Sequence, residues 1–141
     1  LIPTGGYMPV VGTPLDLREG MLLADGIEAK DSCVPMVWAG GYDHNFVLRK
    51  GSAMALCAFV YHEDTGRSME VITDQPGVQC YTGQGLNHTG KGGVHYGPYA
   101  GVCLETQHYP DAIHHPHFES YVLRPQDTYD TFTIYKFSVE A

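Results

Sequence analysis

Short apolar or alternating runs dominate the sequence, and Gly, Pro, Asn and Asp interrupt them throughout, whereas segments with a helical period are hard to find. Strict alternation and short apolar runs are typical of β-strands, and the interrupting residues favour turns. The 141 residues include 17 Gly and 9 Pro, which fits many short strands joined by turns. The pattern therefore predicts an all-β chain that forms a single domain portion over residues 1–141.

The clearest pair of strands is predicted at residues 53–61 and 68–73, because the segment between them contains Asp64 and Gly66, which tolerate turn geometry. In the segment 129–139, apolar side chains occupy both alternating faces, which predicts a strand buried on both sides between stacked sheets. One short helix is expected around residues 15–23, where Gly20 weakens it. A long glycine-rich loop is expected at 84–98. Further strands are predicted at residues 34–38, 78–82, 101–107 and 121–123.

Composition excludes several classes of partner. The chain is 43% hydrophobic and 17% charged, carries a net charge of -8, and has no cluster of Lys or Arg that could neutralise phosphates. Nucleic acid and anionic membranes are therefore poor candidates. The longest apolar run, at residues 53–61, is half of what a bilayer span requires. We expect a soluble protein with no nucleic-acid or membrane partner.

The cysteines and the first residue bear on where the protein is found and on how much of it is present. The four cysteines lie 23 or 24 residues apart and form no Cys-x-x-Cys pair, so reduced cysteines in the core and a cytoplasmic location are favoured over disulfides. The chain begins with Leu1 and not with Met, which suggests a piece of a longer chain or a processed product. A trimmed polypeptide is the alternative. The cysteines are Cys33, Cys57, Cys80 and Cys103.

Three polar residues in apolar or turn-rich surroundings are candidates for binding or catalysis: Glu105 in the segment 101–107, Asp43 behind two glycines, and Gln79 after Pro76-Gly77. Burying a carboxylate costs free energy unless it is paired or used. The alternatives are an exposed sheet face for Glu105 and a turn that caps its own backbone for Asp43. Acid and amide groups that converge among aromatic side chains suit a polyhydroxylated ligand, so carbohydrate is the expected class.

A histidine-rich segment at residues 108–119 offers a competing site. Its four histidines and two acids could hold zinc, iron or nickel. The spacing of His115, His117 and Glu119 resembles the metal-binding segment of cupin-type barrels, but there the Glu comes later and a spaced Gly follows it. Two prolines also break the run. A solvent-facing loop is favoured, and no metal site is predicted.

Three motifs occur together and in order: Gly-Tyr-Asp-His-Asn-Phe at residues 41–46, Pro-Gly-Val-Gln-Cys-Tyr-Thr-Gly at 76–83, and Cys-Leu-Glu-Thr-Gln-His-Tyr-Pro-Asp at 103–111. This ordered set closely resembles the aldose 1-epimerase family, also called galactose mutarotases. The opening segment 3–18 and the closing segment 123–137 fit the same family. The resemblance therefore spans nearly the whole chain.

The resemblance implies a β-super-sandwich enzyme that interconverts the α and β anomers of free hexoses such as galactose and glucose, with no metal or organic cofactor. By matching the motifs, Glu105 takes the role of general base on the anomeric hydroxyl. Asp43 and Gln79 contact the sugar. In the family, a histidine protonates the ring oxygen, and general acid and base groups acting together accelerate such a reaction.

The resemblance also implies that this chain corresponds only to the C-terminal part of family members, which are more than twice as long. The catalytic acid histidine then lies upstream, so the expected partner is the N-terminal portion of the same enzyme, either on the same polypeptide or as a second chain. Edges and apolar faces left uncovered without it favour the same view. Two alternatives remain open: a non-catalytic carbohydrate-binding or regulatory module, and a hexose-6-phosphate 1-epimerase.

Overall fold

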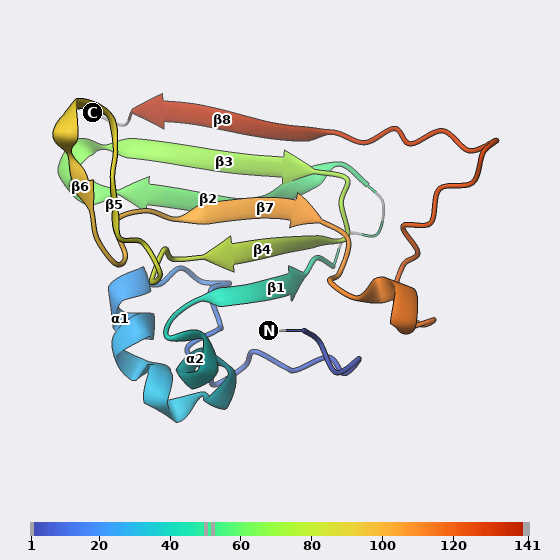
Figure 1. Ribbon diagram of the computed structural model, residues 1–141, viewed down its shortest axis with the longest axis horizontal. Helices are drawn as coiled ribbons and strands as arrows, with labels where there is room; N and C mark the ends of the chain where they lie inside the picture. Colours follow the sequence, from blue (N-terminus) through green and yellow to red (C-terminus); the bar gives the residue numbers. More distant parts are fainter. Residues whose placement is uncertain (1, 50, 52, 140–141) are drawn as a thin grey trace. The chain divides into compact units, whose positions relative to one another are not determined.

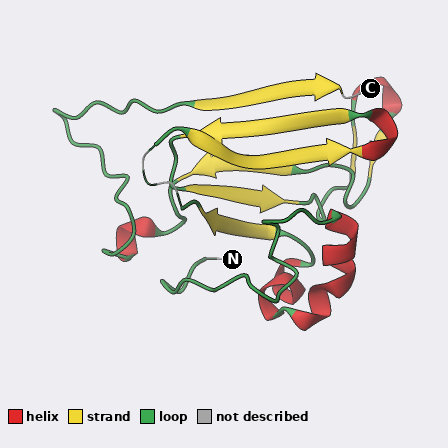
Figure 2. Ribbon diagram, turned by 180° about the vertical axis from the view of Figure 1, so that it is seen from behind, coloured by secondary structure: helices red, strands yellow, loops and turns green. Residues whose placement is uncertain are grey.

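The computed structural model describes residues 2–49, 51 and 53–139, so Leu1, on which the expectation of a longer chain rests, lies outside the described residues. The chain forms two compact units. Unit 1 comprises Leu1–His44 and Cys80–Cys103, and unit 2 comprises Asn45–Gln79 and Leu104–Ala141. Most regular structure is β, in two three-stranded sheets and one two-stranded sheet, and the helices are short (Figure 2). The prediction of an all-β sandwich class is confirmed.

One three-stranded sheet has the order β1-β4-β7 (Figure 1). The unit boundary falls inside each of its strands, so each strand supplies residues to both units. Asp43 is the first residue of β1, Gln79 lies within β4 and Glu105 lies within β7. The strands are β1 (Asp43–Val47), β4 (Gly77–Tyr81) and β7 (Cys103–Gln107).

Unit 2 contains the second sheet, in which β2 (Ala55–His62), β3 (Arg67–Thr73) and β8 (Thr133–Val139) run antiparallel in the order β2-β3-β8. The predicted hairpin is confirmed: β2 and β3 are joined by the 3-10 turn Glu63–Thr65 and by Gly66, whose φ of 65° lies in the left-handed region that favours glycine. The register of β2 shifts between Leu56 and Ala58, which marks a bulge on this edge strand.

The two faces of this sheet differ because directly paired residues share a face. Val71 and Thr73 of β3 are fully buried. On the same face of β8, the Tyr135 hydroxyl donates to the Leu104 carbonyl at 2.8 Å, and the Thr133 and Thr106 hydroxyls lie 2.5 Å apart. This inner face of the sheet therefore stacks against β7, as expected for a β-sandwich.

The prediction for residues 129–139 is only partly correct. β8 begins at Thr133, and apart from this residue the whole strand is exposed, so the expected burial on both faces is wrong for this chain. The preceding residues are held by side chains instead. The Asp74 carboxylate accepts hydrogen bonds from the Phe132 N–H, and Gln75 Nε2 donates to the Tyr129 hydroxyl at 3.2 Å. Burial requires a covering layer, and the described part of the chain covers only part of β8.

Unit 1 contains the helices α1 (Leu23–Glu28) and α2 (Val34–Ala39), joined by the 3-10 turn Ala29–Ser32. The predicted strand at residues 34–38 is therefore wrong. Pro35 lies in the first turn of α2, and Gly40 ends it in a left-handed conformation; both are helix-boundary signals that the apolar run obscured. The helix expected at 15–23 is also wrong, since Gly20 has a φ of 84° and α1 begins only at Leu23.

Two further predictions need correction. The expected loop at 84–98 contains the two-residue strands β5 (His88–Thr89) and β6 (His95–Tyr96), separated by the 3-10 turn Lys91–Gly93. The strand predicted at residues 121–123 is an exposed segment without regular structure. The strands predicted at 78–82 and 101–107 are confirmed as β4 and β7. A 3-10 turn at Ala112–His114 completes the regular elements of unit 2.

None of the four cysteines, all of which the structure describes, forms a disulfide, and Cys33 and Cys80 are buried. Among the described residues, no helix has the length and apolar character that crossing a membrane would require.

Candidate functional site

Glu105 lies at the centre of β7, and its side chain is exposed. Its two neighbours point to the opposite face, because successive side chains alternate across a strand. Leu104 is buried, and its carbonyl accepts a hydrogen bond from the Tyr135 hydroxyl. The Thr106 hydroxyl is hydrogen-bonded to the Thr133 hydroxyl. These contacts fix the backbone on both sides of Glu105. The carboxylate is thus carried on a rigid strand and directed away from the sandwich interior, where a ligand can reach it.

Gln79 is half-buried on β4, the strand next to β7, and both Gln79 and Glu105 belong to unit 2. Two residues before it, Gly77 makes room for close neighbours. A Cβ at Gly77 would lie 2.6 Å from Asn45 Oδ1 and 3.1 Å from the Tyr109 ring. The Tyr109 hydroxyl also donates to the Pro76 carbonyl at 3.3 Å. Packing therefore requires glycine at position 77.

Asp43 is half-buried at the start of β1 and belongs to unit 1. The residue before it is strongly anchored. Tyr42 is fully buried, its hydroxyl donates to the Pro14 carbonyl at 2.7 Å, and its N–H donates to Thr82 Oγ1 at 3.1 Å. Gln84 Nε2 donates to the Tyr42 carbonyl at 3.1 Å. Burial raises the pKa of Tyr42 to about 12, so its hydroxyl keeps the proton that it donates.

The glycines before Asp43 are explained by the same network. A Cβ at Gly41 would lie 3.0 Å from Thr82 Oγ1 and 3.3 Å from the Tyr99 ring. The Tyr99 hydroxyl in turn donates to the Gly40 carbonyl at 2.6 Å. Side chains from residues 82–99 therefore hold the backbone that leads into Asp43. Asp43 itself is the first residue of β1.

His44 follows Asp43 and supports it locally. Its Nδ1 accepts the Asp43 N–H at 3.1 Å. Burial lowers the pKa of His44, whereas the Pro35 backbone and the Asp43 carboxylate act to raise it and offset only part of this effect. A lowered pKa keeps the ring neutral at pH 7, and a neutral Nδ1 is free to accept the Asp43 N–H. In the same unit, burial raises the pKa of the Cys80 thiol to about 11, so this cysteine is not a reactive thiolate.

The histidine-rich segment is only partly solvent-facing: Ala112 and Phe118 are buried and His115 is half-buried, whereas His114 and His117 are exposed. The Asp111 carboxylate contacts ring nitrogens of His114 and His115, the latter at 3.5 Å, and His108 Nε2 lies 4.0 Å from Glu119 Oε1. Among the residues that the structure describes, no group of three or more His, Cys, Asp or Glu could hold a metal ion. The geometry therefore gives the cupin-like spacing no metal-binding arrangement.

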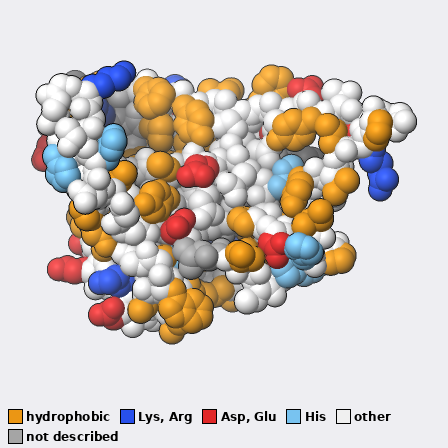
Figure 3. Space-filling view, viewed as in Figure 1, with side chains coloured by type: hydrophobic (Ala, Val, Ile, Leu, Met, Phe, Trp, Pro, Cys, Tyr) orange, Lys and Arg blue, Asp and Glu red, His pale blue; other side chains and the backbone are white. Residues whose placement is uncertain are grey.

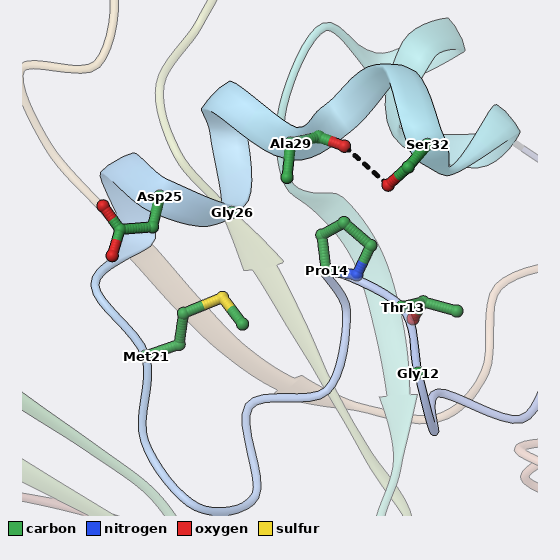
Figure 4. A pocket seen from close by; sticks show the side chains of 8 residues that line it. All are labelled: Gly12, Thr13, Pro14, Met21, Asp25, Gly26, Ala29 and Ser32. Carbon is green, nitrogen blue, oxygen red and sulfur yellow. Dashed lines mark hydrogen bonds between the residues drawn. The ribbon is translucent and has the colours of Figure 1, made fainter.

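A hollow of about 370 Å³ lies in unit 1, beside α1 (Figure 4). Its walls are mostly backbone and apolar atoms, and the Ser32 hydroxyl is already bonded to the Ala29 carbonyl at 2.8 Å. None of Asp43, Gln79 and Glu105 lines it. The lining residues are Gly12, Thr13, Pro14, Met21, Asp25, Gly26, Ala29 and Ser32.

Sequence reasoning located the three candidates but missed the residues that support them. Tyr42, Thr82, Gln84 and Tyr135 act through partners 28 to 42 positions away in the chain. Tyr42 and Thr82 lie inside the motifs at 41–46 and 76–83, Gln84 follows the second of them, and Tyr135 lies in the closing segment 123–137; this membership was the only available signal. In chemical terms, unit 2 presents an exposed carboxylate that can accept a proton, on the strand beside one that carries an amide able to donate to and accept from hydroxyl groups.

Comparison with known proteins agrees with the ordered motifs. Residues 1–136 match the family model of aldose 1-epimerase. The galactose mutarotases of Homo sapiens and Bos taurus are 45% and 44% identical to this chain over 141 residues. The aldose 1-epimerase of Escherichia coli (strain K12) is 33% identical over 143 residues.

The solved structures agree as well. The crystal structure of a GalM/aldose epimerase homologue from C. elegans matches with a TM-score of 0.83 and 27% identity, covering 98% of this chain and 40% of that one. The alignments with both mammalian proteins cover 99% of this chain but only 39% of each relative, in its C-terminal part. The resemblance inferred from the motifs is confirmed: the chain belongs to the aldose 1-epimerase family.

Proposed function

We propose that the protein containing this chain is an aldose 1-epimerase that interconverts the α and β anomers of free hexoses such as galactose and glucose. The observation that carries the proposal is Glu105, an exposed carboxylate in the family's motif, fixed between two residues that are anchored on the opposite face. Gln79 on the adjacent strand and Asp43 at the start of β1 supply hydrogen-bonding groups for sugar hydroxyls.

The chemistry requires one proton to be removed and one to be supplied. Glu105 takes the proton of the anomeric hydroxyl, the bond from C1 to the ring oxygen breaks, and a general acid protonates that oxygen to give the open-chain aldehyde. Rotation about the bond between C1 and C2 and closure by the reverse transfers give the other anomer. Each positioned acid or base contributes about 10²- to 10⁴-fold to such a step.

The acid is proposed to come from the N-terminal portion of the same enzyme, present either on the same polypeptide or as a second chain. This chain spans about two-fifths of the length of the curated relatives it matches, so a large part of their length has no counterpart here. We propose a cytoplasmic location, in keeping with four free thiols.

Polarimetry of freshly dissolved α-D-galactose tests the proposal. We expect acceleration of mutarotation when the upstream-encoded portion is supplied together with this chain, and a loss of at least about 100-fold in that rate for Glu105→Gln. Glu63→Gln, an exposed Glu in a turn, is the control and should keep the rate. An unchanged rate for Glu105→Gln would remove Glu105 from the mechanism. Sugar binding without acceleration would identify a non-catalytic carbohydrate-binding module.

A further inference from the structure

The inner face of the β2-β3-β8 sheet in unit 2 is covered at one end only. Paired residues form successive rows along this face. The rows at the Thr73 end contain Thr133 and Tyr135 of β8, which contact β7. Val71 and Thr73 in these rows have no exposed surface. At this end the face is the packed core of a sandwich.

The other end of the same face lies open. Its rows pair Met69 with Phe137 and Arg67 with Val139. Phe137 is 73% exposed and Val139 is 72% exposed. A hollow of about 420 Å³ is lined by Arg67, Ser68, Phe137, Ser138 and Val139. Hydrophobic side chains gather at this end of β8 in the space-filling view (Figure 3). Met69 and its partner Val60 are half-buried, so the exposed part of this end lies along β8. An apolar face that is core at one end and exposed along its edge strand at the other indicates a missing layer.

Of the two edge strands of this sheet, β8 is the one suited to pair with a further strand. β2 and β8 are the two edge strands. β2 carries a bulge, a feature that protects an edge from pairing with another strand. β8 pairs with β3 in an unbroken register over seven residues, contains no proline, and has a single charged side chain, Lys136, which is bonded to Glu70 at 3.0 Å. Its free edge is therefore a regular, unprotected template for another strand.

We propose that the free edge of β8, together with Phe137 and Val139, is the docking surface for the portion of the enzyme that precedes this chain, which adds a strand to β8 and covers the open end of the inner face. The length of the matched relatives identifies this occupant. This chain matches the C-terminal part of the relatives, and about three-fifths of each relative's length has no counterpart in it. The proposal rests on the proposed function, since it names where the portion supplying the acid binds.

The test is co-expression of tagged chain with the segment encoded upstream of Leu1, followed by quantitation of the co-purified segment. Phe137→Lys should reduce the recovered segment by about tenfold or more, because a mostly exposed Phe loses its apolar contact. Phe59→Lys is the matched control, because it makes the same substitution at a 53% exposed Phe of β2 that pairs with Glu70 and therefore lies on the opposite face of the sheet. It should leave recovery unchanged. Val139→Lys is the second variant and should act like Phe137→Lys.

Hydrogen exchange of β8 amides gives an independent readout of strand addition. In the complex, amides of residues 133–139 should exchange at least tenfold more slowly than in the chain alone, since a pairing strand closes the free edge. Three outcomes would each overturn the proposal: equal effects of Phe137→Lys and Phe59→Lys, unchanged exchange in β8, or a reading frame that begins at this chain. So would a dimer of this chain that Phe137→Lys disrupts while the upstream segment stays unbound. A complex that forms as expected but lacks mutarotase activity supports the docking surface and contradicts the proposed function.

Discussion

The strand that carries Glu105 is fixed by stacking on a second sheet, whereas the residue before Asp43 is fixed by side-chain hydrogen bonds inside a buried network. In unit 2, the hydroxyls of Tyr135 and Thr133 that reach β7 belong to a largely exposed strand. In unit 1, Tyr42 and Thr82 are both buried.

This difference determines what the loss of one partner costs. A polar group near solvent that loses its partner forms a hydrogen bond to water instead. A buried polar group stays without a partner, which lowers the free energy of unfolding by about 1–3 kcal/mol. The support of Asp43 should therefore be sensitive to single changes, and that of Glu105 tolerant. The comparison can be tested by stability measurements on this chain.

The largest effect is expected for Gly26→Ala in α1. The new Cβ would overlap the Tyr42 hydroxyl and lie 2.8 Å from Tyr42 Cζ. Because Tyr42 is fully buried and its hydroxyl donates to the Pro14 carbonyl, relieving the overlap requires a shift of the ring or of α1 that breaks this hydrogen bond. We expect a loss of about 3 kcal/mol in the free energy of unfolding, measured by urea denaturation. Gly6→Ala, with nothing within 4 Å of the new Cβ, should be neutral. An equal midpoint for both variants would contradict a rigid network.

Thr82→Val should have the next largest effect. The valine keeps the shape but removes the Oγ1 that accepts the Tyr42 N–H at 3.1 Å. The buried N–H then loses this partner, and we expect a loss of about 1–3 kcal/mol. Thr89→Val, at an exposed threonine of β5, provides the control for the change of residue type. If the two threonine variants unfold at the same urea concentration, the buried network contributes no more than exposed hydroxyls do.

How far the sequence predicts this molecule depends on whether the deciding contacts are local. The hairpin of β2 and β3 is predictable because Gly66 and its neighbours determine the turn. The helix α2 is obscured because its apolar residues also suit a strand, and only Pro35 and Gly40 mark its ends. The exposure of β8 could not be predicted, since the alternation of apolar residues shows which faces require a cover and not which segment supplies it.

The candidate site follows the same rule. The motifs identify Glu105, Asp43 and Gln79 as single positions, because each lies in a short recognisable segment. Their supports are distant in sequence: Pro14 with Tyr42, and Leu104 with Tyr135. Such pairs leave no periodic signal in one sequence, so the rigidity of the site became visible only in the fold.

Tyr135→Phe tests the tolerant side of the comparison. It removes the hydroxyl that donates to the Leu104 carbonyl at 2.8 Å but keeps the ring. Since β8 is largely exposed, water can replace the lost donor, and we expect a loss of about 1 kcal/mol or less. Tyr61→Phe, on the opposite face of the sheet, is the control. A loss for Tyr135→Phe larger than that for Thr82→Val would reverse the comparison.

The smallest effect is expected from pH and His44. Burial lowers the pKa of this histidine below its ordinary value of 6.5. As the pH falls, His44 therefore binds a proton in the unfolded chain before it does so in the folded chain. Stability from this group is therefore fully present above pH 6.5 and is lost as the pH falls toward the folded pKa. His44→Gln should remove that part of the pH dependence, measured as the change in urea midpoint between pH 7.5 and pH 5.5, whereas His88→Gln, at an exposed histidine, should retain it. If His44→Gln keeps the full pH dependence of stability, water reaches the ring beside Asp43. The proposed difference between a water-excluded network that supports Asp43 and solvent-accessible contacts that support Glu105 would then be wrong at His44.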